Sequence, residues 1–179
     1  MPCPLHLRGT AAVAILLATS LGGCDDSGPA FAPACPQLTL LRDAADLTRF
    51  RPGGRDLTDM MADARISAVP ASCSYATPQT VTARMSVTVQ VSRGPAAQGR
   101  TVSVPYFIAV TEGDQVRDEQ DYTLNTSFPA NVDSVTANGQ EITLRLPITA
   151  DKSAAAYKIY VGFRLNPDEL AYNRARGPR

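Results

Sequence analysis

The chain has 179 residues, and its 17 basic and 17 acidic side chains leave no net charge at neutral pH. Because no excess of arginine and lysine creates a basic field, we do not expect a nucleic-acid partner. No stretch matches the Gly-rich motifs G-x-x-x-x-G-K-[ST] or G-x-G-x-x-G, so we expect no nucleotide cofactor.

Residues 1–23 have the parts of a secretory signal peptide: one positive charge at Arg8, about 12 apolar or small residues over 9–20, and small residues before a cysteine. The apolar run is too short to cross a hydrocarbon core, which needs about 20 residues. The ending Leu21-Gly22-Gly23-Cys24 resembles the lipobox of bacterial lipoproteins. This resemblance implies cleavage before Cys24 and acylation of Cys24, so that acyl chains hold the mature protein on a lipid bilayer.

The cysteines support export. Cys3 leaves with the leader and Cys24 carries lipid, so Cys35 and Cys73 remain in a chain sent to an oxidising compartment. We predict that these two form a disulfide, which would close a loop of 37 intervening residues. In the chain-entropy model this contributes about 3 to 4 kcal/mol. The alternative is a metal site or a redox pair, but no C-x-x-C motif and no nearby histidine supports it.

Residues 24–34 (CDDSGPAFAPA) have the composition of a flexible tether. A tether of about ten residues spans about 18 Å on average and at most about 35 Å, so the domain should stay near the membrane surface. Asp25 resembles the enterobacterial signal for inner-membrane retention; the outer membrane is the alternative. We expect one domain over 35–174 and a frayed, arginine-containing tail over 175–179.

Alternation of apolar and polar residues is the main pattern of the domain. It is clearest over 81–92, 142–148 and 157–165, and it predicts strands with one buried face. Further strands are predicted over 37–41, 59–69, 73–75, 101–111 and 116–128. Asn138-Gly139 predicts a tight hairpin turn, and Gly113-Asp114 plays a similar part. Pro105 indicates an edge strand or a bulge, because proline has no N–H to donate.

Helix signals are few. Asn166 is positioned to cap a short helix that begins at Pro167 and carries Asp168 and Glu169 in its first turn. A second short turn is predicted over 43–47. Seven or eight short strands with almost no helix predict an all-β fold, an antiparallel two-sheet sandwich of the immunoglobulin-like type. A small barrel is the alternative.

The residues of the chain exclude most kinds of catalytic site. The single histidine, His6, lies in the leader, so the mature chain has no histidine for a nucleophilic triad or a metal site. The densest acidic set could seat a hard cation, but it lacks the spacing of a calcium loop and is more typical of a solvated hairpin tip. It comprises Glu112, Asp114, Asp118, Glu119 and Asp121. Lys152-Ser153 is a weak candidate for a Ser-Lys pair. We therefore predict neither an enzyme nor a cofactor.

Aromatic residues suggest a binding surface. If Tyr106 points inward with its apolar neighbours, Phe107 points outward, and Tyr160 is outward on its own strand. Phe107 and Tyr160 are therefore the candidate interaction patch, because exposed aromatic groups tend to mark interfaces. In the alternative, a bulge at Pro105 reverses the register and buries Phe107.

The mature chain also carries a set of short motifs: Cys35-Pro36, Leu40-Leu41 with Asp43-Ala44, TRFRPG at 48–53, CSY at 73–75, RGPA at 93–96, VPYF at 104–107 with Ala109-Val110, and AYNR at 171–174. As a set they resemble an uncharacterised family of alphaproteobacterial lipoproteins. The resemblance covers essentially the whole mature domain. It implies a single-domain lipoprotein and carries no activity and no catalytic residues.

These observations predict a membrane-anchored envelope lipoprotein that displays a disulfide-stapled sandwich in the periplasm. The sandwich would act as a structural or protein-interaction module, with the bilayer as one expected partner and another envelope protein as the second. One rival is a binding module for a small ligand or a glycan, with Tyr106, Phe107 and Tyr160 as candidate contacts. The other is an enzyme that uses carboxylates, which would need two acidic side chains converging in a cleft.

Overall fold

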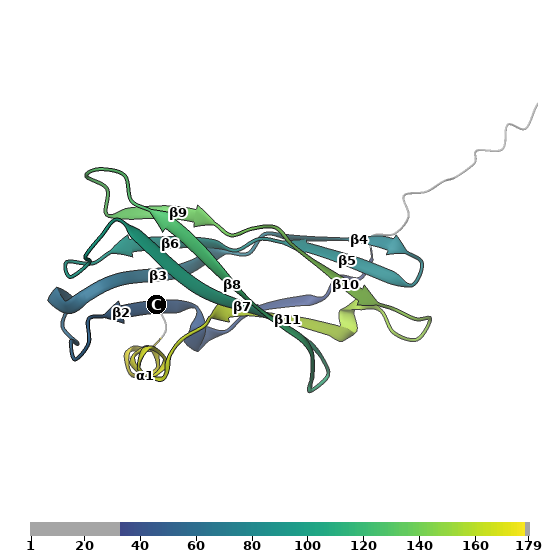
Figure 1. Cartoon of the computed structure of the whole chain (residues 1–179). Helices are drawn as coiled ribbons and strands as arrows, with labels where there is room; N and C mark the ends of the chain where they lie inside the picture. The colour runs from purple at the N-terminus through teal and green to yellow at the C-terminus, as the bar shows by residue number, and fades with distance from the viewer. Residues whose placement is uncertain (1–32, 178–179) are drawn as a thin grey trace, which may run out of the picture. The chain divides into compact units, whose positions relative to one another are not determined.

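The computed structural model describes residues 33–177; the leader, Cys24 and most of the expected tether lie outside the described residues. The described residues fold as part of one compact unit (Figure 1). The strands are β1 (Gln37–Leu40), β2 (Asp46–Phe50), β3 (Met60–Ala68), β4 (Ala71–Thr77), β5 (Thr80–Met85), β6 (Thr88–Arg93), β7 (Thr101–Glu112), β8 (Gln115–Ser127), β9 (Ser134–Asn138), β10 (Ile142–Pro147) and β11 (Tyr157–Phe163). The helices are the 3-10 turns η1 (Arg42–Ala44), η2 (Leu57–Asp59) and η3 (Ala154–Ala156), and the α-helix α1 (Pro167–Arg176).

The strands pack as two layers. The first layer is the sheet β1-β11-β7-β8, in which β1 runs parallel to β11 and the other neighbours are antiparallel. The second layer contains the sheets β2-β3-β6-β9 and β4-β5-β10. The prediction of an all-β, antiparallel sandwich with one short C-terminal helix is confirmed.

The core lies between the layers and follows the predicted alternation. Every inward residue predicted over 81–92 is buried: Val81, Ala83, Met85, Val87, Val89 and Val91. The facing layer contributes large buried side chains from β7 and β11, among them Tyr106 and Phe163. Burying a side chain of this size stabilises a fold by about 1.5 to 3 kcal/mol. Burial of these alternating apolar side chains therefore provides the main favourable free energy of folding.

The second layer is bent rather than divided, because its strands continue across the break. β3 leads into β4, β5 into β6, and β9 into β10, and the Gly139 N–H donates to the Val87 carbonyl across the bend at 2.8 Å. The predicted hairpin at Asn138-Gly139 is therefore wrong, since β9 and β10 pair with β6 and β5 as two halves of one bent strand. Glycine is needed here for space: a Cβ on Gly139 would lie 2.6 Å from the Tyr106 hydroxyl oxygen.

Pro105 lies in the central strand β7 and not on an edge or in a bulge, which corrects both readings of this residue. It faces Thr123 of β8, and its carbonyl accepts from the Arg164 N–H at 2.9 Å. The proline nitrogen faces the same side as that carbonyl, toward Arg164 just beyond the last residue of β11, so only the terminal pair of this ladder lacks one of its two bonds. The irregularity in this hairpin lies further on, between Val110 and Thr111. As a result the inward register of Tyr106 is kept, and Phe107 lies on the outer face.

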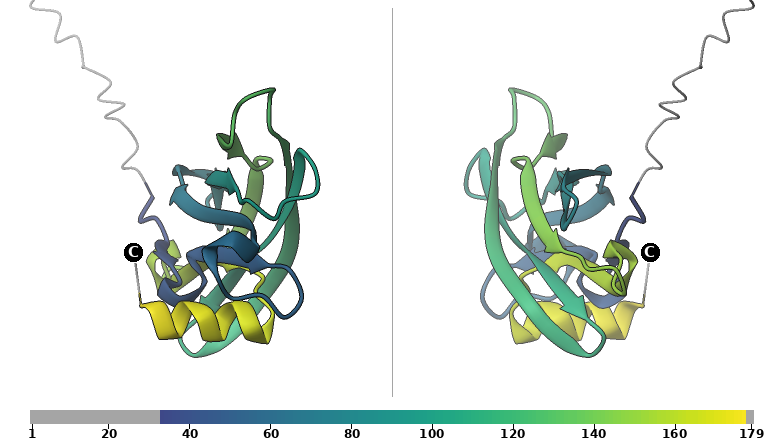
Figure 2. Two further views of the ribbon diagram at one scale, coloured as in Figure 1. Left: turned by 90° about the vertical axis from the view of Figure 1, so that its left-hand side faces the viewer. Right: turned by 90° about the vertical axis from the view of Figure 1, so that its right-hand side faces the viewer.

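The C-terminal helix has the predicted start. Asn166 accepts from the Glu169 N–H at 2.8 Å, and the Glu169 carboxylate accepts from the Asn166 N–H at 3.0 Å, which is a capping box. The helix continues to Arg176, two residues beyond the expected domain end at 174. Figure 2 shows α1 along one side of the domain, where it packs against β2 and η1.

The strand β2 has no counterpart among the predicted elements. In place of the short turn predicted over 43–47, the turn η1 ends at Ala44 and a strand begins at Asp46. The strand is half polar, yet Asp46 and Thr48 are buried because α1 and β3 supply polar partners. Asn173 donates to the Asp46 carbonyl at 2.7 Å, and Arg176 donates to the Thr48 hydroxyl at 3.3 Å. Tertiary hydrogen bonds therefore replace the apolar alternation that would have indicated a strand.

Candidate functional site

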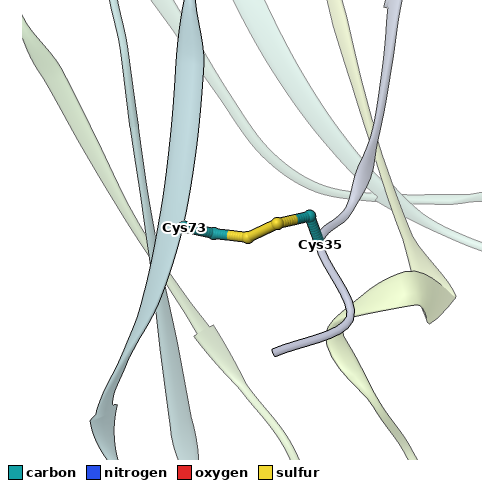
Figure 3. Close-up of a disulfide and its surroundings, with 2 residues drawn as sticks. All are labelled: Cys35 and Cys73. Carbon is teal, nitrogen blue, oxygen red and sulfur yellow. A yellow bond between two sulfur atoms is a disulfide. The ribbon is translucent and has the colours of Figure 1, made fainter. Parts of the chain in front are cut away.

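The edge strands of one layer face those of the other at four places, two at each end of the sandwich. Within the described residues, three of these four gaps between edge strands are closed. Cys35 before β1 is bonded to Cys73 in β4, which closes the β1/β4 edge (Figure 3). At the opposite end, β8 packs against β9, and α1 packs against β2. The fourth gap, between β8 and β10, holds a cleft of about 810 Å³. We treat this cleft as the candidate functional site.

The floor of the cleft is apolar and belongs to the core. Val110 of β7 and Leu144 and Leu146 of β10 line it, and all three are buried. The alternation that places Leu144 and Leu146 on the inner face of β10 also places Thr143 and Arg145 at its rim. An apolar floor with a polar rim is the usual composition of a binding cleft.

One wall of the cleft is a network around Lys152. Its ammonium donates to the Tyr157 hydroxyl at 2.9 Å and to the Glu112 carboxylate at 3.1 Å. Tyr157 donates in turn to the Pro147 carbonyl at 2.8 Å, and Arg117 donates to the second Glu112 oxygen at 3.0 Å. These bonds hold the β10–β11 connection against the β7–β8 hairpin and thereby shape one end of the cleft.

The same network stabilises the charged forms of Glu112 and Lys152. The hydrogen bond from Lys152 lowers the pKa of Glu112, and the hydrogen bonds to Tyr157 and Glu112 raise the pKa of Lys152. At neutral pH Glu112 is therefore ionised and Lys152 protonated, which suits a fixed ion pair better than an acid–base catalyst. The Lys152 donors are directed at Glu112 and Tyr157, which leaves Ser153 outside this network.

The opposite wall is formed by Asp118 and Gln120 on the inner face of β8. Tyr122, further along the same strand, donates to Gln120 at 2.7 Å, and Gln120 donates to Asp118 at 2.9 Å. The Tyr122 ring is stacked on the buried Tyr106, with ring centroids 5.3 Å apart. Burial raises the pKa of both tyrosines, so their hydroxyl groups stay protonated and remain hydrogen-bond donors.

Among the described residues, both strands beside the cleft lie at a sheet edge and present unpaired backbone there. The Ile148 N–H donates to the Gln79 carbonyl at 2.9 Å, which sets the phase of the β10–β5 ladder. Because bonded and non-bonded pairs alternate in an antiparallel ladder, the N–H and C=O groups of Thr143 and Arg145 point away from β5. The Phe128 N–H donates to the Arg100 carbonyl at 2.7 Å and sets the β8–β7 ladder in the same way. Residues 119, 121 and 123 of β8 therefore direct their backbone groups to the free edge.

The acidic residues that lie close together in the sequence, Glu112 to Asp121, lie on different faces of the domain. Glu112 and Asp118 line the cleft, whereas Glu119 and Asp121 lie on the outer face, where both bind Arg164. Within residues 33–177 no group of three or more acidic, cysteine or histidine side chains is arranged to hold a metal ion. Glu112, Glu119 and Asp121 act instead as the charged partners of Lys152, Arg117 and Arg164.

Phe107 and Tyr160, the predicted interaction patch, lie on the outer face of the first layer. Both are half-buried, and the Arg164 guanidinium lies 4.4 Å from the Phe107 ring centroid. The role of this patch stays a prediction. Among the described residues, the large apolar side chains that are most exposed are others, namely Leu57, Tyr75 and Val116. Tyr75 and Val116 lie in predicted strands, but nothing in the alternation indicated their exposure.

The predicted disulfide between Cys35 and Cys73 is present, with the Cα atoms 6.0 Å apart. Lipidation at Cys24 falls outside the described residues. Within residues 33–177, no helix is long and apolar enough to cross a bilayer. No family model, no curated protein and no solved structure matches this chain. The resemblance to alphaproteobacterial lipoproteins therefore rests on its motifs alone.

Proposed function

We propose that the protein is a lipoprotein held on a bacterial membrane through acylated Cys24, and that its sandwich binds an extended segment of another envelope protein in the β8/β10 cleft. The observation that carries this proposal is the pair of free strand edges beside an apolar floor. The Cys35–Cys73 disulfide is compatible with an oxidising compartment, and the leader motif supports export. Asp25 favours the inner membrane.

Binding would proceed by strand addition. An extended segment in the cleft would exchange hydrogen bonds with the outward backbone groups of Thr143 and Arg145, or with those of β8. Alternate side chains of the segment would then face Leu144, Leu146 and Val110, and the others would face solvent. Main-chain bonds would supply affinity, and the side chains that meet the floor would supply specificity.

The free edges carry protection against pairing with copies of the same chain. Arg117, Glu119 and Asp121 lie along the exposed half of β8, and charged side chains are a common defence of sheet edges. Paired charges at the rim would also discriminate between partners. A charge in the bound segment that found no opposite charge at the rim would be buried at a cost in binding free energy. The fixed ion pair of Glu112 and Lys152 supports a binding role rather than a catalytic one.

The first experiment is site-specific photo-crosslinking in the native envelope. A photoreactive amino acid in place of Thr143 lies at the rim of the cleft, where a bound segment would pass. We expect one dominant crosslinked protein, lost when Cys24→Ser removes the anchor. Mass spectrometry of the adduct identifies the partner. A single adduct that persists unchanged without the anchor, or no adduct at all, would refute the proposal.

A matched pair of variants separates backbone from side-chain recognition. Arg145→Pro removes the outward N–H, whereas Arg145→Ala removes the side chain and keeps the N–H. Proline is tolerated at a non-bonded edge position, so both variants should fold, and thermal unfolding checks this. We expect the proline variant to lose the crosslinked partner and the alanine variant to keep it. Equal retention would exclude pairing at β10.

A second candidate, the binding of a small polar ligand such as a glycan, is favoured by the row Asp118, Gln120 and Tyr122. Asp118 and Gln120 offer donors and acceptors along one wall of the cleft, and Tyr122, which is stacked on the buried Tyr106, donates to Gln120. If this is the function, Gln120→Ala should abolish binding of the ligand while Arg145→Pro leaves it intact. Affinity screening against oligosaccharides with the two variants distinguishes the candidates.

A further inference from the structure

One end of the domain carries an uncharged surface that the cleft does not use. It consists of residues 75–79 around the β4–β5 turn and residues 148–150 after β10, and we call it the apolar pole. Together these residues line a shallow hollow of about 750 Å³, and within the described part of the chain none of the lining side chains is charged. Tyr75 is 51% exposed there, which is unusual for a large aromatic side chain.

The apolar pole lies where the chain enters the domain. Cys35 is bonded to Cys73, which is two residues before Tyr75 in β4. Figure 1 shows the first described residues and the β4–β5 turn at the same end, whereas η2 with the exposed Leu57 lies at the opposite end. Any anchor upstream of Cys35 therefore pulls on the end that carries Tyr75.

We propose that the apolar pole rests on the lipid bilayer, with Tyr75 at the membrane–water interface. This inference depends on the proposed acylation of Cys24. The eleven-residue stretch from Cys24 to Cys35 reaches at most about 35 to 40 Å, so the anchor keeps the pole within reach of the surface. Tyrosine is enriched at such interfaces, because its ring favours the acyl boundary and its hydroxyl group favours water.

The anchor also explains why so small a surface suffices. A tethered domain meets the bilayer at a high effective concentration, so weak interfacial affinity becomes substantial occupancy. The absence of charge in the hollow removes the desolvation cost that a charged side chain would have at the acyl boundary. With the pole on the membrane, the η2 end faces away from it, and the domain has a defined orientation.

The chain contains no tryptophan, so a single introduced tryptophan reports its own surroundings. Tyr75→Trp places the reporter at the apolar pole, and Leu57→Trp places a matched control at the opposite end, where Leu57 is 74% exposed. Both changes are at exposed positions and should not disturb folding. Each full-length lipidated variant is reconstituted into phosphatidylethanolamine–phosphatidylglycerol vesicles, with and without brominated acyl chains, which quench nearby tryptophan.

We expect a blue-shifted emission that is quenched by bromolipid for Tyr75→Trp, and an unshifted, unquenched emission for Leu57→Trp. Adding Cys24→Ser to Tyr75→Trp should abolish the quenching. Vesicle flotation is measured on the same samples. Protein that floats without quenching at position 75, or with equal quenching at both positions, overturns the inference and leaves the anchor intact. Protein that does not float refutes the anchor, and the inference with it.

Discussion

Removal of the disulfide should strongly destabilise the domain. The double variant Cys35→Ala/Cys73→Ala breaks a cross-link between residues separated by 38 positions in the chain. For a loop of this length the chain-entropy relation gives a loss of about 4 kcal/mol in the free energy of unfolding. Domains of ordinary size are stable by about 5 to 15 kcal/mol, so the loss is a large part of the total.

The structure gives this variant a second consequence. The disulfide ties the residues before β1 to β4, so its removal also frees the edge at which the two layers meet. Cys35 is exposed and Cys73 is half-buried, so truncation of the side chains adds little to the cost. The expected loss is therefore dominated by the greater freedom of the unfolded chain.

Urea unfolding followed by circular dichroism measures the effect, in a Cys24→Ser background that avoids lipid. We expect a lower midpoint and a steeper dependence on urea, because the uncross-linked chain exposes more surface when unfolded. The midpoint temperature of thermal unfolding should fall by about 8 to 16 °C. Treatment of the parent protein with a reductant should reproduce the change. A loss below about 1 kcal/mol in the variant would refute the reasoning from loop length.

Three further predictions concern the bend, the helix and the cleft. Gly139→Ala should destabilise the domain by about 1 to 3 kcal/mol, because the added Cβ would lie 2.6 Å from the buried Tyr106 hydroxyl; an unchanged urea midpoint would contradict this. Asn173→Ala should cost about 1 to 3 kcal/mol, because it removes donors to two backbone carbonyls, and hydrogen exchange should rise first in α1. Glu112 has a lowered pKa, so the stability it adds is present above its ordinary pKa of 4.5 and is lost as pH falls through the lower folded value. Glu112→Gln should therefore be less stable than the parent at neutral pH, and urea midpoints should converge below pH 4.5; a constant difference would exclude the linkage to Lys152.

Local sequence was sufficient where local interactions decide the structure. The cap of α1 by Asn166 was foreseen from the residues alone, and the capping box that it forms with Glu169 spans only three positions. The alternation over 81–92 and 157–163 identified the buried face correctly, because successive side chains of a strand point to opposite sides whatever the strand pairs with. The disulfide was foreseen because the expected export of the chain and acylation of Cys24 would leave only two thiols.

Other features depended on distant partners. The strand β2 is polar, and its burial depends on Asn173 and Arg176, more than a hundred positions away. Asn138-Gly139 has the composition of a hairpin turn, yet it forms a bend because β9 and β10 pair with β6 and β5, and the Tyr106 hydroxyl leaves no room for a side chain at position 139. The register at Pro105 was ambiguous until the end of β11 was known.

The sequence by itself determined the fold class, the buried face of most strands, the disulfide and the short C-terminal helix, because periodicity, capping and cysteine spacing act within one strand, one helix turn or one loop. The tertiary structure alone decided which strand edges remain open. An edge is free when no other strand pairs with it, and that depends on the packing of the whole domain. The cleft between β8 and β10 and the apolar pole beside Cys35 are both consequences of this packing, and no window of the sequence contains either.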